Sequence, residues 1–115
     1  ETQTASLPPE GLPDQMRLTF DDGSASLSDG AKRELDQLAR VLTDSPGQRV
    51  QLMAFAEGTE DTASEARRLS LSRALAVRTY LIDQGIRSTR MDVRALGATA
   101  ERGPLNRVDI VPANR

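Results

Sequence analysis

Hydrophobic and polar residues alternate in four short stretches of this chain, and an alternation with period two is typical of β-strands. The stretch at 50–55 is apolar at nearly every position, as expected for a strand that is central or covered on both faces. The four predicted strands cover residues 16–20, 50–55, 91–95 and 108–111.

Between these strands, hydrophobic residues recur every three or four positions, which predicts two helices. The first is expected over residues 29–43, because Ser28 is a suitable N-cap and the Ser-Pro-Gly sequence at 45–47 would end it. The second is expected over residues 64–84, with Gly85 as its C-terminal stop. The helical residues expected in the core are Leu35, Leu38, Leu42, Leu69, Val77 and Leu81.

The predicted order of elements is β-α-β-α-β-β. Two β-α-β crossovers imply parallel neighbouring strands and place both helices on one face of a mixed sheet, which is an α/β (α+β) sandwich of two layers. A chain of 115 residues has room for one domain. We expect that domain at 15–115, preceded at 1–14 by a linker or disordered tail rich in Pro, Ser and Thr, and we expect the chain to be part of a longer protein.

The longer predicted helix also has a second, narrower apolar stripe. It consists of Leu71, Leu75 and Ile82. We expect this stripe to pack on the first helix, and a contact between two copies of the chain is the less favoured interpretation.

Composition excludes several classes of function. The chain has no histidine and no cysteine, so it cannot form a Ser-His-Asp or Cys-His arrangement, a disulfide or an imidazole metal site, and we expect neither a metal nor a cofactor. Its 15 basic and 17 acidic residues give a formal charge of −2, which offers no basic field for a nucleic acid. No apolar run is long enough to span a membrane. Hydrophobic content of 37% with 3% aromatic residues predicts an aliphatic core.

One charged residue interrupts the main apolar face of the second helix. Arg73 lies in the middle of this face, whereas an exposed arginine would be expected on the opposite side. A guanidinium remains charged and is costly to desolvate alone, so we expect Arg73 to have a carboxylate partner. That carboxylate could come from a ligand, or from Glu57, Glu60 or Asp61 in the preceding loop. The apolar residues around Arg73 are Ala66, Leu69, Ala76, Val77, Tyr80 and Leu81.

Three stretches in sequence order resemble the OmpA-like C-terminal domain family, over roughly residues 16–112. The first is Phe-Asp-Asp-Gly-Ser-Ala-Ser-Leu at 20–27. The second is Leu69-Ser70, Arg73-Ala74, Val77, Tyr80-Leu81 and Gly85-Ile86. The third is Asn106-Arg107-Val108-Asp109-Ile110.

The resemblance implies a site for peptidoglycan. The family arginine that matches Arg73 holds a carboxylate of diaminopimelate in the stem peptide, and an aspartate that ends a Gly-His-Thr-Asp motif holds its ammonium group. This chain has Ala-Phe-Ala-Glu at 54–57, which keeps the charge as Glu57, and it has Ala66 in place of a family asparagine. We expect weaker binding than is typical of the family, at a site that also includes Leu69, Arg107 and the backbone of Ala56.

The function expected from this resemblance is a non-catalytic module that anchors an envelope protein to peptidoglycan through diaminopimelate. Its expected location is the periplasm of a diderm bacterium, tethered to a membrane by a missing N-terminal part. The alternative is a degenerate domain that binds an envelope protein or serves assembly without peptidoglycan. A hydrolase that uses the acidic loop is weaker still. Taken alone, Glu57 is also consistent with a solvated loop residue, and Arg107 with a surface charge at a strand end.

Overall fold

Strands and helices follow one another along the chain in the predicted order. The structure is a computed structural model that describes residues 15–100 and 102–113, so the linker or tail expected at 1–14 lies outside the described residues. A short 3-10 turn at Ser88–Arg90 precedes the third strand. The main elements are β1 (Met16–Thr19), α1 (Asp29–Asp44), β2 (Val50–Phe55), α2 (Ala63–Asp83), β3 (Met91–Gly97) and β4 (Arg107–Pro112).

The four strands form one mixed sheet in the order β1-β4-β2-β3. The last strand, β4, lies between β1 and β2 and is antiparallel to both. Ile110 of β4 pairs with Met16 of β1 on one side and with Leu52 of β2 on the other. β2 and β3 are parallel neighbours, as their β-α-β crossover predicts. The expectation of adjacent parallel strands is wrong for β1 and β2, because β4 inserts between them and pairs with both.

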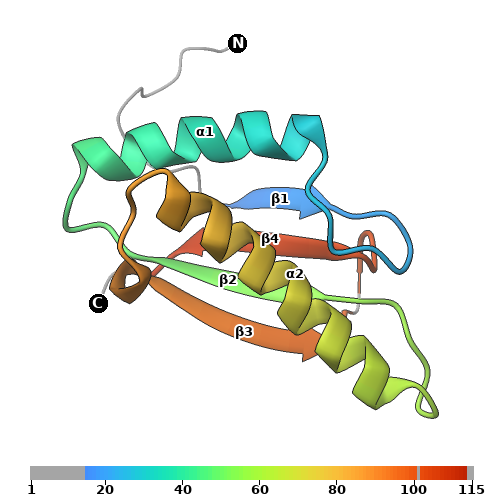
Figure 1. Ribbon diagram of the computed structural model, residues 1–115. Coiled ribbons are helices and arrows are strands. Elements are labelled where there is room, and N and C mark those ends of the chain that lie inside the picture. The colour runs from blue at the N-terminus through green and yellow to red at the C-terminus, as the bar shows by residue number, and fades with distance from the viewer. Residues whose placement is uncertain (1–14, 101, 114–115) are drawn as a thin grey trace, which may run out of the picture.

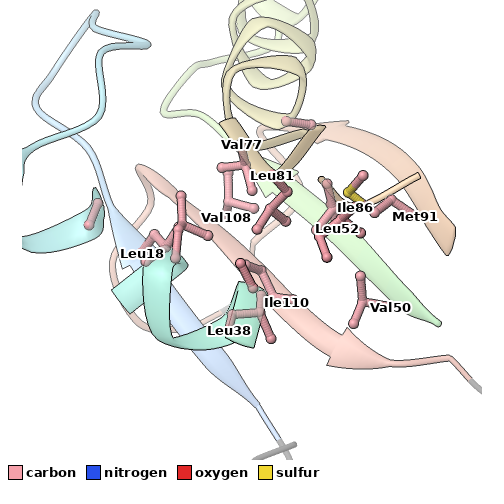
Figure 2. Packing of buried hydrophobic residues seen from close by; sticks show 14 of the residues in the cluster. Leu18, Leu38, Val50, Leu52, Val77, Leu81, Ile86, Met91, Val108 and Ile110 are labelled. Carbon is pink, nitrogen blue, oxygen red and sulfur yellow. The ribbon is translucent and has the colours of Figure 1, made fainter. Parts of the chain in front are cut away.

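Both helices cover the same face of the sheet, and the hydrophobic core fills the space between the two layers (Figure 1). Figure 2 shows Leu38 of α1 and Val77 of α2 in one hydrophobic cluster with Val108 and Ile110 of β4. Five of the six predicted helical core residues are buried, whereas Leu69 is partly exposed. The aliphatic core expected from composition and the two layers expected from the order of the elements are therefore both present.

Small residues bring α2 close to β3, and this contact determines which side of the helix is buried. Ser70 and Ala74 have no exposed surface, and the Ser70 hydroxyl accepts a hydrogen bond from the Gly97 backbone N–H at 3.0 Å. Gly97 has a φ of +58°, and a Cβ there would lie 3.2 Å from the Arg67 Cα. The side of α2 that is buried is therefore centred on these small residues, and it differs slightly from the side on which the larger apolar residues, such as Leu69, lie.

The second apolar stripe of α2 does not pack on α1. Leu71, Leu75 and Ile82 are 41%, 38% and 41% exposed, so the prediction that they contact the first helix is wrong. The contact between the helices lies on another side of α2, where the Tyr80 hydroxyl donates to Asp36 Oδ1 at 2.7 Å. At 100° per residue, that side is well separated from the stripe.

Local signals explain most of the element boundaries. Ser28 caps α1, because its hydroxyl accepts the Ala31 backbone N–H at 3.0 Å. After α2, the left-handed Gly85 at φ +99° ends the helix and the Ile86 N–H reaches back to the Leu81 carbonyl. Neither helix in the described part of the chain combines the length and hydropathy needed to cross a bilayer.

Candidate functional site

Arg73 lies in the middle of α2 with no exposed surface, and its guanidinium joins three segments of the chain. Nε donates to the Ser24 carbonyl at 2.7 Å, and NH2 donates to the Asp21 carbonyl at 3.0 Å. NH1 donates both to the Phe55 carbonyl at 3.0 Å and to Asn106 Oδ1 at 2.9 Å. Four of the five N–H groups of the guanidinium therefore have protein acceptors.

The interpretation that pairs Arg73 with a carboxylate of the preceding loop is wrong, whereas a carboxylate from a ligand stays a prediction. Within the described residues, no Asp or Glu forms an ion pair with it, and Glu57, Glu60 and Asp61 do not touch the guanidinium. Three carbonyl dipoles and one amide oxygen replace water around the charge. Burial lowers the pKa of Arg73, and the nearby Asp22 charge partly opposes that shift.

Asn106 connects Arg73 to Glu57. Its side-chain oxygen accepts the Glu57 backbone N–H at 3.1 Å as well as the arginine NH1, and its amide nitrogen lies 3.5 Å from Glu57 Oε1. The Asn106 carbonyl also accepts the Phe20 N–H at 2.9 Å. The structure thus brings Arg73 and Glu57 to the same place, with the buried guanidinium behind Asn106 and the Glu57 side chain in solvent.

Asn106 is missing from the site expected from sequence, although it opens the third family-like stretch. A polar amide directly before an alternating strand is a weak signal by itself. Its position opposite the end of β2 follows only from the pairing of Phe55 with Arg107 in the sheet. That pairing cannot be read from the order of the elements.

The loop after β2 packs tightly on the start of α2. Ala56 is buried, and its N–H donates to the Gly97 carbonyl at 2.9 Å, so this backbone donor is already used. A Cβ added to Gly58 would lie 2.8 Å from the Cβ of Ala66, which is itself buried. The absence of a side chain at Gly58 therefore lets the loop close on the helix against Ala66.

Arg107 lies on the other face of the sheet from Arg73. Its neighbours Val108 and Ile110 are in the core, so the alternation of β4 points Arg107 and Asp109 away from the helices. Arg107 Nε donates to Asp109 Oδ2 at 3.0 Å, and its CZ atom lies 4.3 Å from the centre of the Phe55 ring. It is only 7% exposed, so the interpretation of Arg107 as a surface charge is wrong.

A small ion-pair network holds Arg107 in place. Asp109 accepts Arg17 Nε at 2.9 Å on its other oxygen, which links β1 to β4. Arg107 NH1 also donates to the carbonyls of Arg102 and Pro104, at 2.7 and 2.6 Å, and so fixes the loop before β4. The arrangement accounts for Arg107 through contacts within the protein.

The remaining expected residue, Leu69, lies one turn before Arg73 on α2 and is partly buried. A cleft of about 540 Å³ lies on the β3 side of the neighbouring loop, and its walls include Thr59, Glu60, Arg67 and Ala98 but neither Arg73 nor Glu57. In the described ranges, no group of three acidic side chains is placed to hold a metal ion.

Comparison with known proteins identifies what this arrangement resembles. Residues 19–107 match the model of the OmpA family. No curated protein matches the chain. Among solved structures, a peptidoglycan-associated lipoprotein from Burkholderia pseudomallei is similar, with 26% identity and a TM-score of 0.74 over 84% of this chain and 89% of that one.

Two further structures support the fold alone, because their identities are lower. The OmpA-like domain of FopA1 from Francisella tularensis subsp. tularensis SCHU S4 has 21% identity and a TM-score of 0.78, over 87% of this chain and 72% of that one. The C-terminal domain of MotB from Helicobacter pylori has 18% identity and a TM-score of 0.73, over 87% and 85%.

Proposed function

This chain belongs to the OmpA family, and on that premise we propose that it is a non-catalytic module that binds peptidoglycan. The observation that carries the proposal is the match over residues 19–107, supported by the similarity to a peptidoglycan-associated lipoprotein. The absence of histidine and cysteine from the sequence also agrees with a binding role. The proposal extends to a periplasmic location, where peptidoglycan and an envelope protein partner would both be reached, with the membrane tether in a part of the protein outside this chain.

The finer form of the proposal concerns diaminopimelate in the stem peptide. The exposed Glu57 carboxylate would take the ammonium group at the free end of that residue, and Arg73 would take its carboxylate. Asn106 lies between the two charges, within hydrogen-bond distance of Arg73 NH1 and of the Glu57 backbone. This juxtaposition of an exposed anion and a cation is what a zwitterionic end group requires.

The burial of Arg73 sets a condition on this binding mode. The guanidinium has no exposed surface, so a ligand carboxylate reaches NH1 only after the Asn106 side chain moves away. A charged acceptor forms a stronger hydrogen bond than an amide oxygen, which favours the exchange. Desolvation of the carboxylate opposes it, and this balance agrees with weak binding.

Co-sedimentation with purified sacculi tests the general proposal, and Glu57→Gln tests the role of the exposed charge. The glutamine keeps the length of the side chain and its contact with Asn106 but removes the charge, so binding should weaken about tenfold. Glu60→Gln is the matched control, because it makes the same change at an exposed position of the same loop. Equal binding by both variants would remove Glu57 from the site.

A second comparison tests whether Arg73 reads the carboxylate. Sacculi with lysine in place of diaminopimelate keep the ammonium group but lack the carboxylate that would meet Arg73. We expect clearly weaker binding to these sacculi. Equal binding to both kinds would leave the general proposal intact and contradict the role of Arg73.

The burial of Arg73 also favours a second candidate, a domain that serves protein interaction or assembly without peptidoglycan. Protein acceptors already satisfy most of the guanidinium, and the loop at Gly58 packs closely on Ala66 of the helix. Wild-type protein that stays in the supernatant with both kinds of sacculi would support this candidate. Asn106→Ala separates the two further, because removal of the amide opens a path to Arg73 and should strengthen binding if a ligand uses it.

A further inference from the structure

Helix α2 carries exposed apolar residues on the side that faces away from the sheet. Figure 1 shows that no other element among the described residues covers this side of the helix. Of the four large hydrophobic residues that are exposed in the described part of the chain, three lie on this side: Leu71, Leu75 and Ile82. None of them belongs to the core or touches the Arg73 site. Neither the packing of the core nor the proposed binding of peptidoglycan therefore explains why these three residues are apolar.

The spacing of the stripe matches the seam of a helix pair. Leu71, Leu75 and Ile82 are separated by four and seven residues, a spacing that agrees with the a/d repeat of a left-handed helix–helix packing. The opposite side of α2 is already buried against the sheet. A second helix could therefore lie beside α2 and cover the stripe without disturbing the core.

Charge on this side of α2 is entirely basic. At 100° per residue, Arg67, Arg68 and Arg78 flank the stripe, whereas Glu65 and Asp83 fall about 100° away from its centre. A cavity of about 310 Å³ at the N-terminal end of the stripe could receive a side chain of a partner. It is lined by Ser64, Arg67, Arg68, Leu71 and Ala95.

We propose that this side of α2 is a docking surface for an acidic amphipathic helix of another protein. Leucine-like side chains of that helix would pack on Leu71, Leu75 and Ile82, and its carboxylates would pair with the flanking arginines. The inference is independent of peptidoglycan binding, because the surface shares no residue with the Arg73 site.

A second copy of this chain is a poorer occupant for electrostatic reasons. An antiparallel register that stacks Leu71 on Leu75 of a second copy also brings Arg68 opposite Arg78 of that copy. A parallel register places each arginine opposite its own equivalent. Like charges facing one another oppose both registers, whereas an acidic partner would turn the same positions into ion pairs.

Two synthetic helices test the proposed chemistry on the protein in solution. Both have about three heptads with leucine at a and d, and they differ only in having glutamate or lysine at the flanking positions. Methyl NMR shifts should locate the glutamate peptide at Leu71, Leu75 and Ile82, and the lysine peptide should bind at least about tenfold more weakly. Equal binding of the two peptides, or no binding of the glutamate peptide, would overturn the proposal.

Variants of the chain sharpen this test. Leu75→Asp should weaken the glutamate peptide at least about tenfold, whereas Leu105→Asp makes the same change at a 45% exposed leucine outside α2 and should have no effect. Arg68→Glu together with Arg78→Glu should reverse the preference in favour of the lysine peptide. Equal effects of the two leucine variants, or an unchanged preference after the charge reversal, would count against the docking surface.

Two further measurements test whether a second copy of the chain or a membrane binds this side of α2. Sedimentation analysis that shows a dimer of the wild type, dissolved by Leu75→Asp, would replace the proposal with self-association. Binding to vesicles with anionic phosphatidylglycerol headgroups that exceeds binding to the glutamate peptide would replace it with a membrane surface.

In cells, a photocrosslinker at Leu75 of the full-length protein should capture a helical segment with one acidic face and one apolar face. Capture of a basic or non-helical segment would overturn the proposal. Sacculus binding should be unchanged in Leu75→Asp, so this inference and the proposed function fail separately.

Discussion

Replacement of Arg73 by methionine should lower the free energy of unfolding by about 2–4 kcal/mol. Methionine has a similar length and fills most of the space in the middle of α2, so the change removes the donors without leaving a large cavity. Four acceptors then lose their partner, and they belong to Asp21, Ser24, Phe55 and Asn106. These acceptors come from three segments that are far apart in sequence.

The magnitude follows from which acceptors water can reach. The hydrogen bond to the Phe55 carbonyl is buried, so losing it leaves an acceptor unpaired at a cost of about 1–3 kcal/mol. The other three hydrogen bonds are only partly buried, so their acceptors can be rehydrated and each loss costs less. Removal of a desolvated charge offsets part of the total, because burial of a guanidinium is itself unfavourable.

Urea unfolding at neutral pH measures this difference, and Arg68→Met is the matched control. Arg68 is an exposed arginine of the same helix, so its replacement should change stability by no more than about 0.5 kcal/mol. If Arg73→Met is as stable as Arg68→Met, the hydrogen bonds of Arg73 contribute no net stability. The burial of Arg73 would then have to be explained by a ligand and not by stabilisation of the fold.

Three other perturbations have defined outcomes. The single tyrosine, Tyr80, has a pKa raised above 10.0, first by its hydrogen bond to Asp36; ultraviolet titration should show this, and Asp36→Asn should lower the midpoint toward 10.0. Because the folded pKa is raised, the contribution of this group to stability is complete below pH 10 and is lost as the pH rises through the folded value. Asp109→Asn should lower the free energy of unfolding by about 3 kcal/mol, because Asp109 is buried between two arginines. Arg17→Met should lower it by no more than about 1 kcal/mol, because Arg17 is partly exposed, and equal losses in urea unfolding would contradict this account. Gly97→Ala should cost at least about 1–2 kcal/mol in the same assay, because its φ is positive and the new Cβ would press on the backbone of α2; a neutral result would show that the contact is loose.

Periodicity in the sequence was sufficient to predict the elements and their layers. Alternation in the strands and the three-to-four spacing in the helices identify every α-helix and strand of the described chain, with boundaries that differ by only a few residues, but not the 3-10 turn at Ser88–Arg90. Strand order was less accessible, because a β-α-β crossover constrains handedness but does not exclude insertion of a later strand. The rotation of α2 was missed because close contact through Ser70 and Gly97 outweighs the larger Leu69 on its neighbouring side.

The site could be predicted in part. An arginine in the centre of an apolar helix face correctly indicated a buried charge that needs partners, but its partners within the protein are carbonyl and amide oxygens and not the expected loop carboxylates. Carbonyl groups carry no signal in a sequence, since every residue has one. The partners of Arg73 become visible only when the loop at 21–24, the end of β2 and Asn106 are placed together in space.

The central position of β4 affects how and when this domain can fold. The strand that holds β1 and β2 together is the last strand of the sheet in sequence order, so the sheet cannot be completed until the rest of the domain is present. The contacts of β4 with β1 join residues about ninety positions apart in sequence, as in the Arg17–Asp109 pair. Contacts between such distant residues form slowly, so we expect slow folding of this sheet. A chain that ends before Arg107 would lack its central strand and expose two unpaired strand edges, which are prone to aggregation. Loss of β4 should therefore lead to degradation of the entire domain, and not to a shortened domain that still binds.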